Sequence, residues 1–362
     1  MDHAVPLTCR NIEFTPPRGS AGETNQGTLV KVTACSSSHW FFIRLILRSM
    51  QYGDKMVLAH LVMVFVGAYI PSLVFFFSSL CTVRSSKDAV RTAFTYLKYA
   101  LLIFSAHALF DATVYGIALG RSLEFSDADY DDSDFDWGRY ATLMKALGVS
   151  LSVFQEIAKM SDLFTDILIA IILLRLSVAI LSIYSGSAMG NKLRLVSYAM
   201  VLVLGPLILA VFGLRMRYIF EFYNGDYDIG KYSALKGLQI DFSIRVMLLA
   251  ISLAVLVRAI MVKKQIKADK DLTWASTMLI VASVVWLLHT SFAMASIAAW
   301  DNLGIMGIPP IRYEHYNYIF EAVFRIWPQF AVLVIVYVIG RAKTNGIWSK
   351  QQRSPRHVEG GK

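Results

Sequence analysis

Residues 154–181 read FQEIAKMSDLFTDILIAIILLRLSVAIL, an apolar run long enough to cross a membrane that nevertheless begins with several charged side chains. About 20 apolar residues cross the roughly 30 Å hydrocarbon layer as a helix. This run lies within a longer apolar segment near 147–182. Comparable segments occur near 56–81, 92–120, 193–222, 233–262, 273–300 and 316–341. The pattern predicts an all-α fold, a seven-transmembrane helical bundle.

The composition supports an integral membrane protein. Of 362 residues, 56% are hydrophobic and only 17% are charged, and the mean hydropathy is +0.52. Soluble domains have an apolar share of roughly 45–50% even when glycine is counted. Segments of short alternating hydrophobicity, typical of outer-membrane barrels, are not found in the sequence. The lipid bilayer is therefore the first expected partner.

The positions of the basic residues that give the net charge of +9 indicate the orientation of the chain in the membrane and not nucleic-acid binding. Basic residues follow the first, third, fifth and seventh segments, whereas the connections between them are acidic or nearly neutral. The basic residues concerned are Arg84, Lys87, Arg91, Lys192, Arg194, Lys263, Lys264, Lys267, Lys270, Arg341, Lys343, Lys350, Arg353, Arg356 and Lys362. The positive-inside rule then predicts an N-terminus outside or in a lumen and a cytosolic C-terminus.

Outside the helices, the chain divides into an N-terminal arm (1–55), the seven-helix membrane domain (56–341) and a cytosolic tail (342–362). The arm lacks the arrangement of a cleavable signal peptide, so we expect the first span to act as the insertion signal. Residues 39–49, HWFFIRLILRS, are too short and too basic to cross and are expected to lie in the membrane interface. Cys9 and Cys35 can form a disulfide in a lumen, but their spacing has no metal-site pattern. No metal and no cofactor are predicted.

The third span has two possible registers. Between Ala141 and Tyr184 the only helix breaker is Gly148, and a helix of that length reaches about 65 Å. It must tilt, project or break. If Arg175 marks the cytosolic boundary, the charged residues of the opening stretch lie inside the membrane; if the span is 163–184, Asp166 still does. Pro71, Pro206 and Pro328 are expected to kink the first, fourth and seventh spans.

Ionisable and polar side chains recur on six of the spans. His107, Asp111 and Tyr115 are four residues apart, and Gln155, Lys159, Asp162 and Asp166 are spaced four, three and four, so each set shares one helix face. The other spans contribute Arg215, Arg217, Glu221, Gln239, Asp241, Arg245, His289, Glu321, Arg325 and Gln329. Given the predicted orientation, nearly all lie on the outer side of the bilayer midplane, and the cytosolic halves are apolar.

A charge exposed to lipid at the bilayer centre costs between roughly 3 and over 10 kcal/mol, so these groups are expected to face inward and pair. The spacing suggests Asp241 with Arg245, Glu321 with Arg325, and Lys159 with one of the three acids near it on its helix. A carboxylate one turn away can also orient the His107 imidazole. The sequence thus predicts a polar cavity that opens to the outside or lumen. The alternative is a set of purely structural salt bridges.

An inward cavity in a membrane suits acid chemistry on a greasy substrate. A carboxylic acid kept protonated by burial can protonate an alkene or epoxide, and aromatic faces can stabilise the resulting carbocation. We expect catalytic residues among Asp166, Asp162, Lys159, Glu156, His107 and Asp111. Substrate-binding residues are expected among Tyr115, Asp241, Arg245, His289, Glu321, Arg325 and Trp327. Asp166 is the first choice for the acid, with Lys159 as its charge partner and His107 with Asp111 facing them.

Other functions fit less well. The acidic connection DADYDDSDFD (127–136) resembles the D-x-D-D proton-donor motif of one soluble class of terpene cyclase, but a run this acidic is interpreted as a solvated loop. Seven spans with an outer N-terminus suit a G-protein-coupled receptor, yet the D/E-R-Y and N-P-x-x-Y patterns are missing, as is a lysine in the last span for retinal. A transporter or channel needs a polar route through both leaflets, which the apolar cytosolic halves disfavour.

In its size, its seven spans with a short tail, the acidic connection after the second span and the segment FQEIAKMSDLFTDILI, the chain resembles fungal seven-span integral membrane proteins of secondary-metabolite clusters. The resemblance is to those that accompany indole-diterpene (paxilline- and lolitrem-type) biosynthesis. It implies a role in cyclising or handling a prenylated indole intermediate at the endoplasmic reticulum or another endomembrane. Expected partners are a lipophilic small-molecule substrate and other membrane-bound biosynthetic enzymes; no nucleic acid is expected.

Overall fold

The computed structural model describes residues 10–11, 33–34, 52–82, 92–127, 137–185, 191–225, 227–266, 270–300 and 317–341. The chain forms two compact units, Met1–Lys55 and Met56–Lys362. In the first unit, strands β1 (Arg10–Asn11) and β2 (Thr33–Ala34) pair antiparallel. The interfacial segment 39–49, Cys9 and Cys35, the D-x-D-D tetrad and the tail lie outside the described residues.

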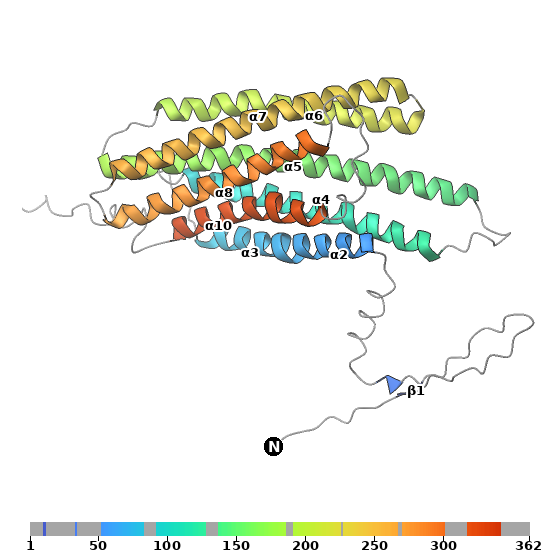
Figure 1. The fold of residues 1–362 in the computed structure, drawn as a ribbon. Helices are drawn as coiled ribbons and strands as arrows, with labels where there is room; N and C mark the ends of the chain where they lie inside the picture. The colour runs from blue at the N-terminus through green and yellow to red at the C-terminus, as the bar shows by residue number, and fades with distance from the viewer. Residues whose placement is uncertain are drawn as a thin grey trace, which may run out of the picture. The chain divides into compact units, whose positions relative to one another are not determined.

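The described part of the second unit is entirely helical (Figure 1). It contains seven helices long and apolar enough to cross a membrane, which confirms the predicted helical class and the predicted number of apolar helices. The orientation of the termini remains a prediction. The elements are α2 (Tyr52–Val64), η1 (Phe65–Tyr69), α3 (Ile70–Thr82), α4 (Thr92–Asp127), α5 (Trp137–Ser185), α6 (Asn191–Asn224), α7 (Tyr227–Gln265), α8 (Lys270–Trp300), η3 (Ala322–Ile326) and α10 (Trp327–Arg341).

Helix α5 is the central element of the bundle. It packs against α4, α6, α7, α8 and α10, and it lies between the α6–α7 pair and the α2–α3 span (Figure 1). Of its most apolar 18-residue window, 67% is buried inside the protein, against 17% for the first span. A helix surrounded by protein can carry charged residues within a membrane because its neighbours supply partners. This position explains why the opening stretch of α5 is so rich in charge.

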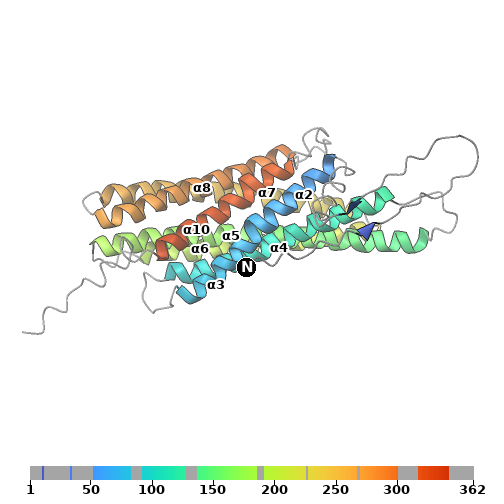
Figure 2. The same cartoon turned by 90° about the horizontal axis from the view of Figure 1, so that it is seen from below.

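The third span neither breaks nor changes direction. Helix α5 runs for 49 residues without interruption, and its first turns and the last turns of α4 extend beyond α2 and α10 at one end of the bundle (Figures 1 and 2). Of the three possibilities that the sequence left open, a break is therefore excluded, whereas tilt and projection stay predictions. Leu143, Lys145 and Ala146 of the extending turns are exposed, whereas Asp162 and Asp166 lie in the packed part of the helix.

Two of the three prolines coincide with a change of helical winding. The π-helical turns η1 and η3 stand directly before Pro71 and Pro328. Proline has no N–H to donate to the preceding turn, so a wider turn accommodates the ring and frees backbone carbonyls. In η3 the Arg325 carbonyl lies 2.8 Å from His289 Nδ1 and accepts a hydrogen bond from it. Pro206, by contrast, lies inside an unbroken α6.

Turns and close packing complete the bundle. Gly225 joins α6 to α7 with a φ of +97°, a conformation that residues with a side chain rarely adopt. At the other end of the bundle the spans meet through apolar side chains such as Leu173, Ile180 and Val336. Gly340 lies so close to Phe94 that an added Cβ would be 2.5 Å from the ring. Small residues of this kind allow α10 and α4 to approach closely.

Candidate functional site

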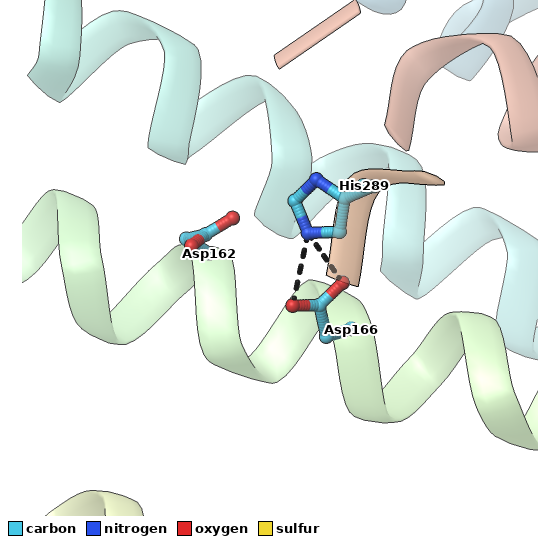
Figure 3. A group of neighbouring side chains, drawn as sticks. All are labelled: Asp162, Asp166 and His289. Atoms are coloured by element: carbon cyan, nitrogen blue, oxygen red, sulfur yellow. Dashed lines mark hydrogen bonds and ion pairs between the residues drawn. The ribbon is translucent and has the colours of Figure 1, made fainter. Parts of the chain in front are cut away.

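The site begins with two carboxylates on one face of α5. Asp162 and Asp166 are one helical turn apart and both side chains are fully buried (Figure 3). The Arg245 guanidinium of α7 donates to both, 2.7 Å to Asp162 Oδ2 and 3.2 Å to Asp166 Oδ2. Asp162 also accepts from Arg325 at 2.9 Å. Two guanidinium groups thus face two carboxylates at the centre of the bundle.

Further hydrogen-bond donors surround the Asp166 carboxylate. The His289 ring of α8 points at its carboxylate, with Nε2 3.0 Å from one oxygen and 3.2 Å from the other (Figure 3). Trp286 Nε1 donates at 3.2 Å and the Gln329 amide at 3.0 Å. The same amide donates to Asp162 at 2.8 Å. A carboxylate with four donors is well solvated by the protein itself, so its burial is compensated.

From this centre an ion-pair network extends to both sides. On one side Arg325 bonds Glu321 at 2.5 Å, and Glu321 accepts from the Tyr115 hydroxyl of α4 at 3.0 Å. On the other side Arg245 lies 3.7 Å from Asp241. Asp241 pairs with Arg215 at 2.8 Å, Arg215 pairs with Glu156 at 3.1 Å, and Glu156 pairs with Lys159 at 3.2 Å. We call these residues, together with Asp162, Asp166, His289, Gln329 and the pair His60–Asp111, the polar network.

The network borders a cavity of about 230 Å³. Its walls include the ionisable residues Tyr115, Lys159, Arg215, Asp241, Arg245, Tyr318, Glu321 and Arg325. Phe292, which stacks on Phe324 at 5.4 Å, supplies an aromatic wall. A second hollow of about 280 Å³ shares Gln155, Lys159 and Arg215 with the first. The predicted polar cavity therefore exists in the described part of the chain, with these walls.

Beyond the network the described spans are packed with apolar side chains. Every buried Asp, Arg and His among the described residues belongs to the network or is His107. Toward the other end, α7 and α10 bury Leu248, Val255, Val332 and Val336 instead. The asymmetry between a polar and an apolar end that the sequence suggested is thus present. A separate hollow of about 840 Å³ between α6 and α7 is lined by apolar residues and Arg258 and contains none of the predicted site residues.

Two predicted pairings, Lys159 with Asp166 and His107 with Asp111, differ from the structure. Lys159 bonds Glu156 and not Asp166, whose cationic partners are Arg245 and His289. Asp111 bonds His60 of α2 at 2.9 Å. His107 instead donates from Nδ1 to the Ala158 carbonyl at 3.0 Å, because its ring turns toward α5. Spacing along one helix suggested these pairs, but Asp166, Asp111 and His107 instead contact residues on other helices.

Other predicted site residues fall into three positions. Tyr115, Asp241, Arg245, Glu321, Arg325 and Lys159 line the cavity, whereas Asp162, Asp166 and His289 are fully buried and Glu156 lines the adjoining hollow. Trp327 lies apart from them. Its indole contacts Gly67 and donates to the Met63 carbonyl at 3.4 Å. Arg215, Gln329 and His60 were not among the predicted site residues, although Gln329 lies at helical spacing from Glu321 and Arg325.

The group Asp162, Asp166 and His289 has ligand atoms within 4.8 Å of one another, a spacing compatible with a metal ion. However, Arg245 and Arg325 already bond these carboxylates at 2.7 to 3.2 Å. A divalent cation there would meet two fixed positive charges, and its attraction to the carboxylates would be offset. We therefore assign these residues to the ion-pair network and not to a metal centre.

Comparison of the chain with protein-family models, with curated proteins and with solved structures finds no match. The class that the fold defines is a seven-helix bundle whose helices are apolar enough to cross a membrane. Any function has to be inferred from the chemistry of the cavity.

Proposed function

We propose that this protein is a multi-pass membrane protein that acts on a lipophilic, isoprenoid-derived molecule by acid–base chemistry in its polar cavity. The observation that carries the proposal is the Tyr115–Glu321 hydrogen bond, 3.0 Å long, in the wall of that cavity. A hydroxyl and a carboxyl joined in this way can pass a proton to a bound substrate. The proposal includes the lumenal orientation of the cavity and residence in an endomembrane.

The size of the cavity limits how a substrate can bind. A volume of about 230 Å³ equals about eight water molecules at ~30 Å³ each. A prenylated indole is larger, so only its reacting end fits, and the rest of the molecule must extend toward the lipid. The aromatic pair Phe292 and Phe324 at this wall can stabilise a developing cation.

Deletion of the gene in the native host, followed by metabolite profiling, tests the proposal. We expect a prenylated precursor to accumulate and the cyclised product to disappear. Restoring the wild-type gene should restore the product. An unchanged metabolite profile would overturn the biosynthetic role. Expression of this protein alone then distinguishes a catalytic role from an accessory one, because only a catalyst forms product from added precursor in membranes that contain no other biosynthetic protein.

A receptor is the second candidate, favoured by one observation. The cavity is small and lined by both charges, which suits the polar end of a signalling ligand. A receptor predicts an unchanged metabolite profile and a lost response to an external compound. A transporter for a lipophilic metabolite is disfavoured because the apolar end of the described helices offers no polar path.

A further inference from the structure

His60 and Asp111 form a pair that makes two hydrogen bonds through the imidazole nitrogens. These two bonds need two protons, whereas a neutral imidazole beside a carboxylate has only one. His60 Nδ1 lies 2.6 Å from the Tyr318 carbonyl oxygen, which can only accept, so Nδ1 carries a hydrogen. Nε2 lies 2.9 Å from Asp111 Oδ2. A hydrogen bond there needs a proton between the two atoms, whether the nitrogen or the oxygen holds it. The pair is therefore either imidazolium–carboxylate or imidazole–carboxylic acid.

His289 and Asp166 repeat the arrangement two turns along the seventh span. His289 Nδ1 lies 2.8 Å from the Arg325 carbonyl, and Nε2 lies 3.0 Å from Asp166. Here, unlike at His60, a second donor is present, because the Gln329 amide nitrogen lies 3.2 Å from Nε2 and can donate to an unprotonated ring. Tyr318 and Arg325 are seven residues apart, which is about two turns of one helix. His107 differs. Its Nδ1 faces a carbonyl, but its buried Nε2 has no hydrogen-bond partner in the described part of the chain, so a neutral ring satisfies it.

Charge balance is a separate argument for one extra proton on each pair. Among the described residues, the polar network contains the six carboxyl groups of Asp111, Glu156, Asp162, Asp166, Asp241 and Glu321. Its permanent cations are the four side chains of Lys159, Arg215, Arg245 and Arg325. One extra proton on each histidine–carboxyl pair brings the total to zero. An uncompensated charge inside a bundle costs several kcal/mol, which favours the neutral total.

The two pairs differ in burial and in their neighbours. His289 and Asp166 are fully buried, and Trp286, Gln329 and Arg245 hold the carboxylate in place. The Asp111 side chain is 13% exposed. His60 and Asp111 do not line the cavity themselves, but Tyr115, which does, lies one turn from Asp111, and its ring is 4.0 Å from the His60 ring between centroids. The groups that face His60 are Asp111 and Tyr115 of α4 and Tyr318 and Glu321 of the seventh span.

From this geometry we propose that the His60–Asp111 pair, which lies behind the cavity wall formed by Tyr115 and Tyr318, holds the transferable proton of the site. The inference rests on the proposed function for its substrate class, an alkene or epoxide of an isoprenoid. As the proton leaves, its bond to the pair breaks and a C–H or O–H bond forms on the substrate. The pair becomes imidazole and carboxylate. When the cyclised cation loses a proton from a neighbouring carbon, the pair takes it back, so no co-reactant is consumed.

The test counts protons without using a substrate. Purified protein in lipid nanodiscs, with ¹⁵N-labelled histidine, is titrated while imidazole nitrogen resonances and the infrared band of protonated carboxyl groups are followed. We expect one proton on the His60–Asp111 pair at neutral pH, and its loss from the spectrum in both Asp111→Asn and His60→Gln. His107→Gln is the matched control and should leave the count unchanged. A neutral His60 beside an ionised Asp111 at neutral pH would overturn the proposal.

A second readout uses product formation in membranes. Because general acid catalysis contributes about 10²–10⁴-fold, Asp111→Asn should lower the rate at least about 100-fold while the helical circular-dichroism spectrum is retained. A wild-type rate in a folded Asp111→Asn variant would contradict the role of this pair. The proton count decides the inference even where no product is found with any isoprenoid, an outcome that overturns the proposed function alone.

Discussion

The two ends of the same seven helices are held together in different ways. At one end, charged side chains from α4, α5, α6, α7 and the seventh span meet around Asp162 and a cavity. At the other end, apolar side chains and small residues such as Gly340 pack without a buried Asp, Arg or His among the described residues. Structural pairing alone does not require one end to be polar. The difference indicates that the polar end has a role beyond holding the helices together.

The largest effect is expected for Asp162→Asn. This carboxylate is fully buried and is shared by Arg245 and Arg325, so the change leaves two guanidinium groups without their common partner. Breaking a buried ion pair in this way costs about 3–5 kcal/mol. Thermal unfolding of the purified protein in detergent measures the loss. A wild-type melting temperature would mean that the polar end contributes little to stability.

A smaller loss of stability but a large loss of function is expected for Glu321→Gln. Arg325 keeps its bond to Asp162 at 2.9 Å, so the cation remains paired. Tyr115 loses the carboxylate that accepts its proton, and product formation should fall about 100-fold. Product formation in membranes and thermal unfolding are measured together. Retained activity in the folded variant would remove Glu321 from the proposed chemistry.

At the apolar end, Gly340→Ala should destabilise the protein by about 1–3 kcal/mol because the added methyl group overlaps the Phe94 ring. Gly205→Ala is the matched control. Its Cβ would meet nothing within 4 Å, and alanine favours a helix over glycine by about 0.5–1 kcal/mol. Denaturation midpoints of the two variants should therefore move in opposite directions. Equal shifts would show that the described packing of α10 on α4 is incorrect.

The smallest effect is expected for Arg217→Gln. Arg217 is 61% exposed and pairs with Glu221 at the polar end, outside the central network. Exposed ion pairs contribute about 0–1 kcal/mol. Its unfolding midpoint and product yield should match the wild type within error. A loss of stability as large as that in Asp162→Asn would mean that the contribution of a charged residue does not depend on whether it belongs to the polar network.

The helices and their polar faces could be predicted because their signals are local. Twenty-residue apolar runs and four-residue spacings identified the spans and the stripe that includes Asp162 and Asp166. Partners on other helices could not be predicted in this way. Asp111 bonds His60, 51 residues away, and Asp166 bonds His289, 123 residues away. His60 was not among the predicted site residues, because no Asp or Glu lies within four residues of it along the chain.

The central claim is that a water-accessible cavity opens on the side of the N-terminus, and cysteine labelling tests it most directly. In a chain with Cys9, Cys35 and Cys81 replaced by serine, Ser296→Cys places a thiol in the cavity wall. Ala254→Cys places one in the apolar hollow between α6 and α7. A charged, membrane-impermeant maleimide should label Ser296→Cys from the N-terminal side only and should leave Ala254→Cys unlabelled. Failure to label Ser296→Cys, or labelling from the side of the C-terminal tail, would contradict the account.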